Sequence, residues 1–135
     1  MTGQGPRKEV GDDYWNGRLR QAREMRDNAR SLVTLEDSSS YNGAITLMIT
    51  AAIAYADAVT AKTKGVVNTQ DHASAPRLLR EVLGNKLPER QEKFYRRLLG
   101  RKDEVNYGAR STTLDEAQRL LAELDEFAQY SENAL

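Results

Sequence analysis

Cysteine is absent from the 135 residues of the chain, and histidine occurs once, as His72. The absence of cysteine excludes a disulfide framework, a thiolate metal site and a cysteine nucleophile. A single histidine excludes a zinc site built from several histidines of one chain. Cysteine-free composition also fits a reducing compartment. We therefore expect a cytoplasmic protein with no bound metal and no cofactor.

The chain also lacks net charge, because twenty Lys and Arg residues balance twenty Asp and Glu residues. No global field attracts nucleic acid, so any such binding has to come from a local patch. The N-terminus, MTGQGPRKEVGDD, is polar and lacks the apolar segment of a signal peptide. The uncharged residues 38–55 are too polar and too short for a membrane span. We expect no membrane partner.

Proline is scarce, and no segment shows the sustained alternation of a strand. The apolar spacing predicts five helices, over residues 13–35, 40–64, 74–83 and 88–107 and from residue 113 onward. Gly65 is placed to close the second helix, and Thr113 and Glu116 fit a capping box at the start of the last. Residues 1–12 are expected to form a disordered tail and residues 13–135 one domain. The predicted fold class is all-α, an antiparallel bundle of about five helices.

The most informative stretch is FYRRLLGRKDEVNYG, residues 94–108. It carries basic residues on a predicted helix that closes on a polar residue, an aromatic residue and a glycine: Arg97, Arg101, Lys102, Asn106, Tyr107 and Gly108. A guanidinium fork matches a phosphate, so this helix could hold one. The same residues fit an ordinary solvated helix face, with Glu104 three residues from Arg101 as a salt-bridge partner. On the predicted helical wheel Arg101 is exposed.

A second basic group recurs at helical spacing on the first predicted helix: Arg23, Arg26 and Arg30. Together with Arg97 and Arg101, these residues could line a groove for an RNA backbone. The alternative is a solvated helix edge interleaved with Glu24 and Asp27, which the zero net charge favours.

The order of elements resembles the HEPN superfamily of small helical bundles over residues 13–135. A long first helix precedes an alanine-rich second helix containing AAIAYADAV, then a short helix, a helix ending in RKDEVNYG and a capped final helix. In that family the penultimate helix carries an Arg followed a few residues later by a His. Arg101 and Asn106 match this spacing, with Asn106 in the place of the His. Tyr107 and Gly108 match the Tyr-Gly of divergent branches.

The resemblance implies a homodimer joined through the face that carries the motif, so that two copies of Arg101 and Asn106 form one cleft. Many members are metal-independent ribonucleases of toxin–antitoxin, CRISPR-linked or antiviral systems, and others are inactive binding or structural modules. The implied partners are RNA, or a cognate antitoxin or nucleotidyltransferase-like protein. The implied role of Tyr107 is left open between stacking on a base, accepting a modification and packing in a core or interface.

Metal-independent RNA cleavage needs a base for the 2′-hydroxyl and a cation for the phosphate. Arg101 could supply the cation, but the amide of Asn106 does not titrate near neutral pH. The loss of general acid–base help costs about 10²–10⁴-fold in rate. His72, next to Asp71, could act as a base from elsewhere or be an exposed loop histidine.

The sequence therefore predicts a HEPN-like dimer that binds RNA or a partner, with weak or lost catalysis. Two alternatives stay open: an active ribonuclease toxin that uses Arg101, and a purely structural or regulatory bundle. The candidate catalytic pair is Arg101 and Asn106. The candidate contacts for RNA or a partner are Arg97, Arg101, Lys102, Tyr107, Arg23, Arg26 and Arg30.

Overall fold

The computed structural model describes residues 6–35, 40–69, 72–108 and 110–135, and of Tyr107 it describes only the backbone. These residues form the helices α1 (Tyr14–Thr34), α2 (Asn42–Lys64), α3 (Ala75–Leu83), α4 (Glu89–Leu99), α5 (Lys102–Tyr107) and α6 (Leu114–Asn133). Two short 3₁₀ turns, η1 (His72–Ser74) and η2 (Gly84–Lys86), flank α3. The predicted all-α bundle is confirmed.

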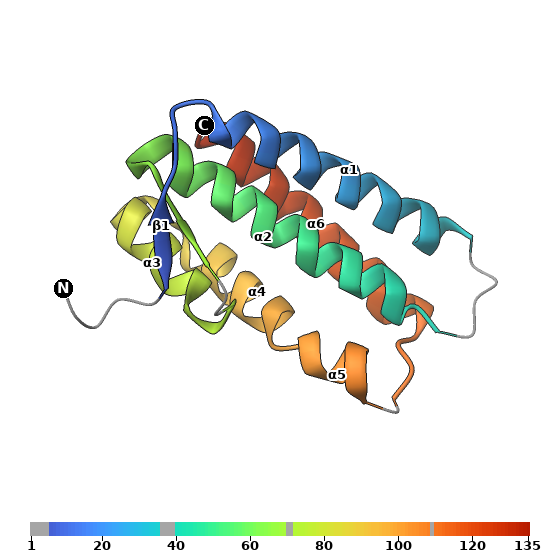
Figure 1. The fold of residues 1–135 in the computed structure, drawn as a ribbon. Helices are drawn as coiled ribbons and strands as arrows, with labels where there is room; N and C mark the ends of the chain where they lie inside the picture. The colour runs from blue at the N-terminus through green and yellow to red at the C-terminus, as the bar shows by residue number, and fades with distance from the viewer. Residues whose placement is uncertain (1–5, 36–39, 70–71, 109) are drawn as a thin grey trace.

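The long helices lie side by side with alternating directions (Figure 1). In this view α2 lies between α1 above it and the α4–α5 pair below it, and α6 lies behind. Helices α1 and α4 run in one direction, and α2 and α6 run in the other. The arrangement is that of an antiparallel bundle, and it puts α2 in the centre.

Helix α2 is the core of the bundle because its surface is apolar on nearly every side. Its alanines let neighbouring helices approach closely, and Ile45, Met48 and Tyr55 are almost completely buried. By length and composition alone the helix could cross a membrane. However, 78% of its most apolar window is buried inside the protein, as in the core helix of a water-soluble bundle.

Two helix ends that were predicted from capping residues are confirmed, the end of α2 and the start of α6. Gly65 closes α2 with a left-handed φ of 68°, and its N–H donates to the carbonyl of Ala61. Thr113 and Glu116 form the capping box at the start of α6. Aromatic rings then join α6 to α4, since the ring centroid of Phe127 lies 5.1 Å from that of Tyr95.

The N-terminal segment differs from the expected disordered tail. Residues Arg7–Glu9 form strand β1, which pairs antiparallel with strand β2 (Val66–Asn68), so that Lys8 lies opposite Val67. The left-handed turn at Gly65 reverses the chain after α2, and Val67 is buried, so β2 offers β1 a fixed edge. Residues 1–5 of the expected tail lie outside the described residues.

The expected single helix over residues 88–107 is divided into α4 and α5. The division falls at Gly100 and Arg101, where the N–H of Arg101 donates to the carbonyl of Leu98 at 3.0 Å, three residues back. Such a short-range bond ends the regular α-helical ladder. Helix α5 then starts afresh and buries Val105 against the bundle. This division decides which way the motif residues point.

Candidate functional site

The motif RKDEVNYG occupies α5 and the residues at its two ends. Arg101 precedes the helix as its N-cap residue, and Gly108 follows it. A Cβ at Gly108 would lie 2.7 Å from the carbonyl oxygen of Glu104, which is closer than real Cβ atoms approach. The glycine is therefore required by the close approach of the chain to the last turn of α5.

Arg101 is half-buried rather than exposed, with 18% of its side chain accessible. Its Nε donates to Glu104 Oε1 at 2.8 Å, and its Nη2 donates to the hydroxyl of Thr112 at 3.4 Å. Its Nη1 lies 4.0 Å from Glu116 Oε2 on α6. The expectation of an exposed Arg101 is wrong, because the division at Gly100 turns the guanidinium toward α6 and the loop before it.

Asn106 is exposed and points to a different helix. Its side-chain oxygen accepts a hydrogen bond from the hydroxyl of Thr46 on α2 at 3.2 Å. Asn106 follows Arg101 by five positions, which on a helix changes the direction of the side chain by about 140°, a little over a third of a turn. Arg101 therefore faces α6, and Asn106 faces α2.

A chain of hydrogen bonds nevertheless links the two residues across the first turn of α2. Arg101 donates to Thr112, and Thr112 donates to the side-chain oxygen of Asn42. The single hydroxyl proton of Thr46 is shared between Asn106 Oδ1 at 3.2 Å and the backbone carbonyl of Asn42 at 3.1 Å. Sequence reasoning missed Asn42 and Thr112, since nothing in their local sequence distinguishes them from ordinary helix-start and loop residues.

A second arginine from the loop after α5 completes the network around Arg101. Arg110 donates to Glu104 at 3.1 Å and to Glu116 at 2.7 Å. The backbone N–H of Thr113, followed by the charge of Arg110 and of Arg101, holds the pKa of Glu116 below its ordinary value. Two guanidinium groups thus meet two carboxylates, and the local charge is balanced.

The other candidate arginines are paired in the same way, and their partners lie on α6. Arg23 bonds Glu132 at 2.6 Å, Arg30 bonds Asp125 at 2.5 Å, and Arg26 lies 3.8 Å from the same Asp125 carboxylate. On the opposite edge of α6, Arg97 bonds Glu123. The hydrogen bond from Arg23 is the main reason that the pKa of Glu132 is lowered. We call these pairs, together with Arg101–Glu116, the α6 clamp.

The structure does not bring the candidate contacts into one cleft. Arg97 and Arg101 share a shallow hollow of about 300 Å³ with Glu116, Arg119, Leu120 and Glu123. Arg30 lines a different hollow beside Asp125. Lys102 lines a third one, and Tyr107 is the last residue of α5, with its side chain outside the described residues.

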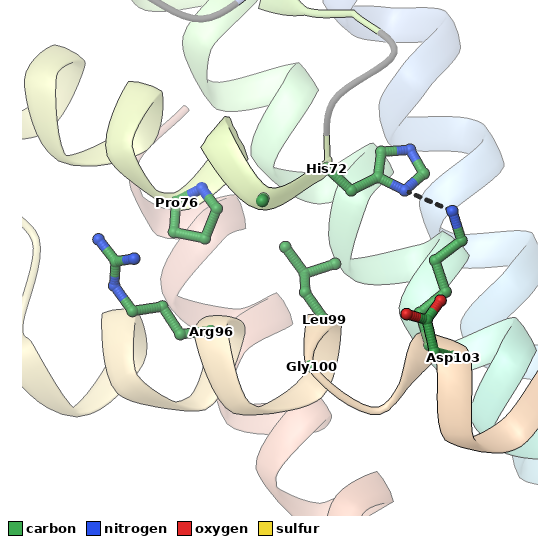
Figure 2. Close-up of a pocket in the computed structure, with 8 residues that line it drawn as sticks. His72, Pro76, Arg96, Leu99, Gly100 and Asp103 are labelled. Atoms are coloured by element: carbon green, nitrogen blue, oxygen red, sulfur yellow. Dashed lines mark hydrogen bonds between the residues drawn. The ribbon is translucent and has the colours of Figure 1, made fainter. Parts of the chain in front are cut away.

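Lys102 faces away from the α6 clamp and toward His72. Figure 2 shows this contact as a dashed line, and it joins Lys102 Nζ to His72 Nδ1 over 3.4 Å. His72 is half-buried in η1, so it is not an exposed loop histidine. The cleft that His72 lines does not include Arg101. The candidate base and the candidate phosphate cation therefore lie in separate hollows.

One further charged pair lies inside the bundle and was not predicted from the sequence. Arg18 of α1 donates to Asp57 Oδ2 of α2 from Nη2 at 2.9 Å and from Nε at 3.1 Å. Burial raises the pKa of Asp57 to about 6, and the charge and hydrogen bonds of Arg18 oppose this rise. Its position between α1 and α2 marks it as a packing element.

Within the described part of the chain, no group of three or more His, Asp or Glu side chains gathers in an arrangement that could hold a metal ion. The fold and the site define an all-α bundle whose motif arginine is tied into its own acidic residues. No protein-family model matches the chain, and no curated protein matches it.

Proposed function

We propose that this chain is a HEPN-like domain that works as a homodimeric binding module for a protein partner, without ribonuclease chemistry. The observation that carries the proposal is the pairing of Arg101 with acidic residues of its own chain. Its guanidinium bonds Glu104 and Thr112 and lies beside Glu116, so its positive charge is already balanced within the protein.

The absence of a histidine beside Arg101 supports the loss of catalysis. Asn106 offers an amide, which neither gives nor takes a proton near neutral pH, and it accepts its hydrogen bond from Thr46. His72 could titrate, but it lines the cleft with Lys102 and Leu99 and not the hollow of Arg101. A transition-state phosphate at Arg101 would lie near the carboxylates of Glu104 and Glu116, but both already accept hydrogen bonds from guanidinium groups and are poorly placed to take a proton.

A protein partner is favoured over RNA because the clamp arginines already have carboxylate partners. To bind a nucleic-acid backbone, each would have to exchange an intramolecular carboxylate for a phosphate, with little net gain in charge pairing. The chain as a whole is neutral, so no field attracts RNA to compensate. The acidic residues of the α6 clamp would also repel the backbone.

The outward stripe of α2 supports assembly through the motif face. Leu47 and Ile53 are only half-buried although α2 is the core helix, and Thr50 between them is exposed. Thr46 starts this stripe, and it carries the hydrogen bond to Asn106. Apolar side chains and a motif residue thus share one side of the protein, as a homodimer joined through the motif would require.

The resemblance then supplies the class of partner. We place the domain in a toxin–antitoxin or antiviral system of the cytoplasm, where its dimer would bind a cognate antitoxin or a nucleotidyltransferase-like protein. An active ribonuclease is the outcome that would replace this assignment.

An RNA cleavage assay in the presence of a chelator distinguishes the binding module from an active ribonuclease. We expect the wild-type chain and the Asn106→His variant to leave RNA intact, because a histidine at residue 106 would face Thr46 and not the guanidinium of Arg101. Cleavage by the wild-type chain that disappears in Arg101→Gln would contradict the proposal. The Arg97→Gln variant is the control for a general loss of positive charge on the same edge.

The homodimer is tested by analytical ultracentrifugation of two matched variants. We expect Thr50→Arg to shift the chain toward monomer, because it places a charge in the middle of the α2 stripe. Thr63→Arg adds the same charge at an exposed position near the end of α2 and should leave the dimer intact. A wild-type chain that is monomeric at high concentration would contradict this part of the proposal.

A further inference from the structure

A cleft separates the start of α3 from the junction of α4 and α5. Its volume is about 470 Å³, which is within the range of pockets that hold small molecules. It lies on the opposite side of α5 from the α6 clamp, and it does not depend on the proposed function above. The lining residues are His72, Ala73, Pro76, Arg96, Leu99, Gly100, Lys102 and Asp103.

Lys102 gives the cleft a cation that is not neutralised by a carboxylate. Among the described residues it forms no salt bridge, and its polar contact is with Nδ1 of His72. Because an ammonium group can only donate, Nδ1 accepts, and the proton of a neutral ring is then on Nε2. The imidazole therefore orients the ammonium without cancelling its charge.

Arg96 adds a second cation, and it shares the carboxylate of Glu92 with Arg80. Glu92 accepts from Arg96 through Oε2 at 2.9 Å and from Arg80 through Oε1 at 2.5 Å. Two guanidinium groups thus depend on one carboxylate, and the pKa of Glu92 is lowered chiefly by the hydrogen bond from Arg80. Among the described residues, Asp103 is the one acidic side chain of the lining, and these residues together keep an excess of positive charge.

The wall between the two cations is apolar. Figure 2 shows Arg96 at one end of the cleft and His72 at the other, with Leu99 between them and Pro76 on the facing turn. A ligand that fills this cleft would place an anionic group beside Lys102. It would lay an apolar body across Leu99 and Pro76, and a planar body would also lie against the guanidinium of Arg96.

We propose that this cleft binds a small aromatic phosphate monoester. The phosphate lies beside Lys102 and His72, where a charge-assisted hydrogen bond to the ammonium fixes it. The ring lies on Leu99 and Pro76. No chemical step is implied, and the site is one of recognition.

The single histidine makes the test direct, because its imidazole signals in an NMR spectrum come from the cleft alone. Phenyl phosphate is the probe, and inorganic phosphate and phenol are the comparison ligands. We expect a saturable shift of the His72 ring signals by phenyl phosphate, with a dissociation constant of about 1 mM or lower. Inorganic phosphate and phenol should each bind at least about tenfold more weakly, since each offers half of the contacts.

Two variants assign the effect to the cleft. Lys102→Gln should weaken phenyl phosphate at least about tenfold while keeping the wild-type fold, since its side chain is partly exposed and forms no salt bridge with a described residue. Lys93→Gln removes an exposed cation of α4 that does not line the cleft and should bind as the wild type does. No saturable shift up to about 10 mM phenyl phosphate would overturn the proposal. The proposal would also be overturned if Lys102→Gln bound phenyl phosphate as tightly as the wild type does. The same holds if the wild type bound inorganic phosphate as tightly as phenyl phosphate.

Discussion

Arg101 and Lys102 are neighbours in the sequence and have opposite surroundings. Arg101 faces the α6 side, where Glu104, Glu116 and Thr112 surround its guanidinium. Lys102 faces the α3 side, where its polar partner is the ring of His72. One cation is part of the scaffold, and the other faces a cleft.

The difference comes from where the acidic residues lie. Helix α6 presents carboxylates along both edges, and arginines of α1 and α4 reach them. The start of α3 presents no carboxylate to Lys102 within the described residues, and the cleft has only Asp103. A basic residue is available for a ligand only where the fold supplies no acid, so the number of arginines in a motif is a poor guide to binding.

Replacing Gly108 should have the largest effect, because it disturbs both sides of α5 together. In Gly108→Ala the new Cβ meets the backbone of Glu104, and α5 is too short to hold its place alone. We expect a loss of about 3 kcal/mol in the free energy of unfolding, measured by urea denaturation. Gly17→Ala in α1 is the control. It has room for a Cβ and should stabilise the helix by about 0.5–1 kcal/mol. Equal effects of the two variants would contradict the close approach at Gly108.

The second largest effect should come from the buried pair of Arg18 and Asp57, which makes the free energy of unfolding depend on pH. Burial raises the pKa of Asp57 from 3.8 to about 6, so the folded chain holds this proton more tightly than the unfolded chain does. The stabilising contribution of the protonated acid is complete below about pH 4 and is lost as the pH rises through 6. Its size is about 2–3 kcal/mol.

The paired carboxylates Glu116 and Glu132 act in the opposite direction. Their lowered pKa values give stability that is present above the ordinary glutamate value of 4.5 and is lost as the pH falls through the lowered values. Stability should therefore peak in weakly acidic solution. Urea denaturation of Asp57→Asn should show no fall between pH 4.5 and pH 7, whereas Asp103→Asn should behave as the wild type. A wild-type chain that is most stable near pH 8 would contradict the raised pKa.

The third largest effect on the free energy of unfolding is expected from a comparison of alanine variants of Arg101 and Lys102. Arg101→Ala removes a half-buried guanidinium with three partners and should cost about 1–2 kcal/mol of unfolding free energy. Lys102→Ala should change it by less than about 0.5 kcal/mol. Thermal melts followed by circular dichroism measure both. A larger loss in the lysine variant would reverse the roles assigned to the two residues.

The exposed pair of Arg30 and Asp125 in the α6 clamp should make the smallest contribution to the free energy of unfolding. Arg30 is 47% exposed, and its pair with Asp125 is screened by salt. Arg30→Ala should therefore cost about 0.2–1 kcal/mol at low ionic strength and less at about 1 M salt. A loss that is unchanged by salt would mean that Arg30 acts through packing.

The sequence predicted the helices well because their apolar spacing and their caps are local. The ends of α2 and α6 follow from Gly65 and from Thr113 with Glu116. The partners of the arginines could not be predicted in this way. Arg23 and Glu132 are 109 residues apart, and their meeting depends on how α1 and α6 are rotated against each other.

The orientation of Arg101 was missed for a related reason. Gly100 has a low helix propensity, but this alone does not reveal that the chain starts a new helix there. A continuous helix would have kept Arg101 on the exposed face. The short-range hydrogen bond from the N–H of Arg101 to the carbonyl of Leu98 ends the regular ladder of α4. The side chain of Arg101 therefore points in a different direction where α5 begins. The strand β1 was missed because three residues are too few to show alternation.

The most direct test of the central claim is an RNA titration of the wild-type chain and of Arg101→Gln at about 50 mM salt, followed by fluorescence anisotropy. If Arg101 belongs to its own carboxylates, neither protein should bind RNA saturably in the micromolar range. Wild-type binding that weakens steeply with salt and is lost in Arg101→Gln would show instead that this guanidinium is available to phosphate.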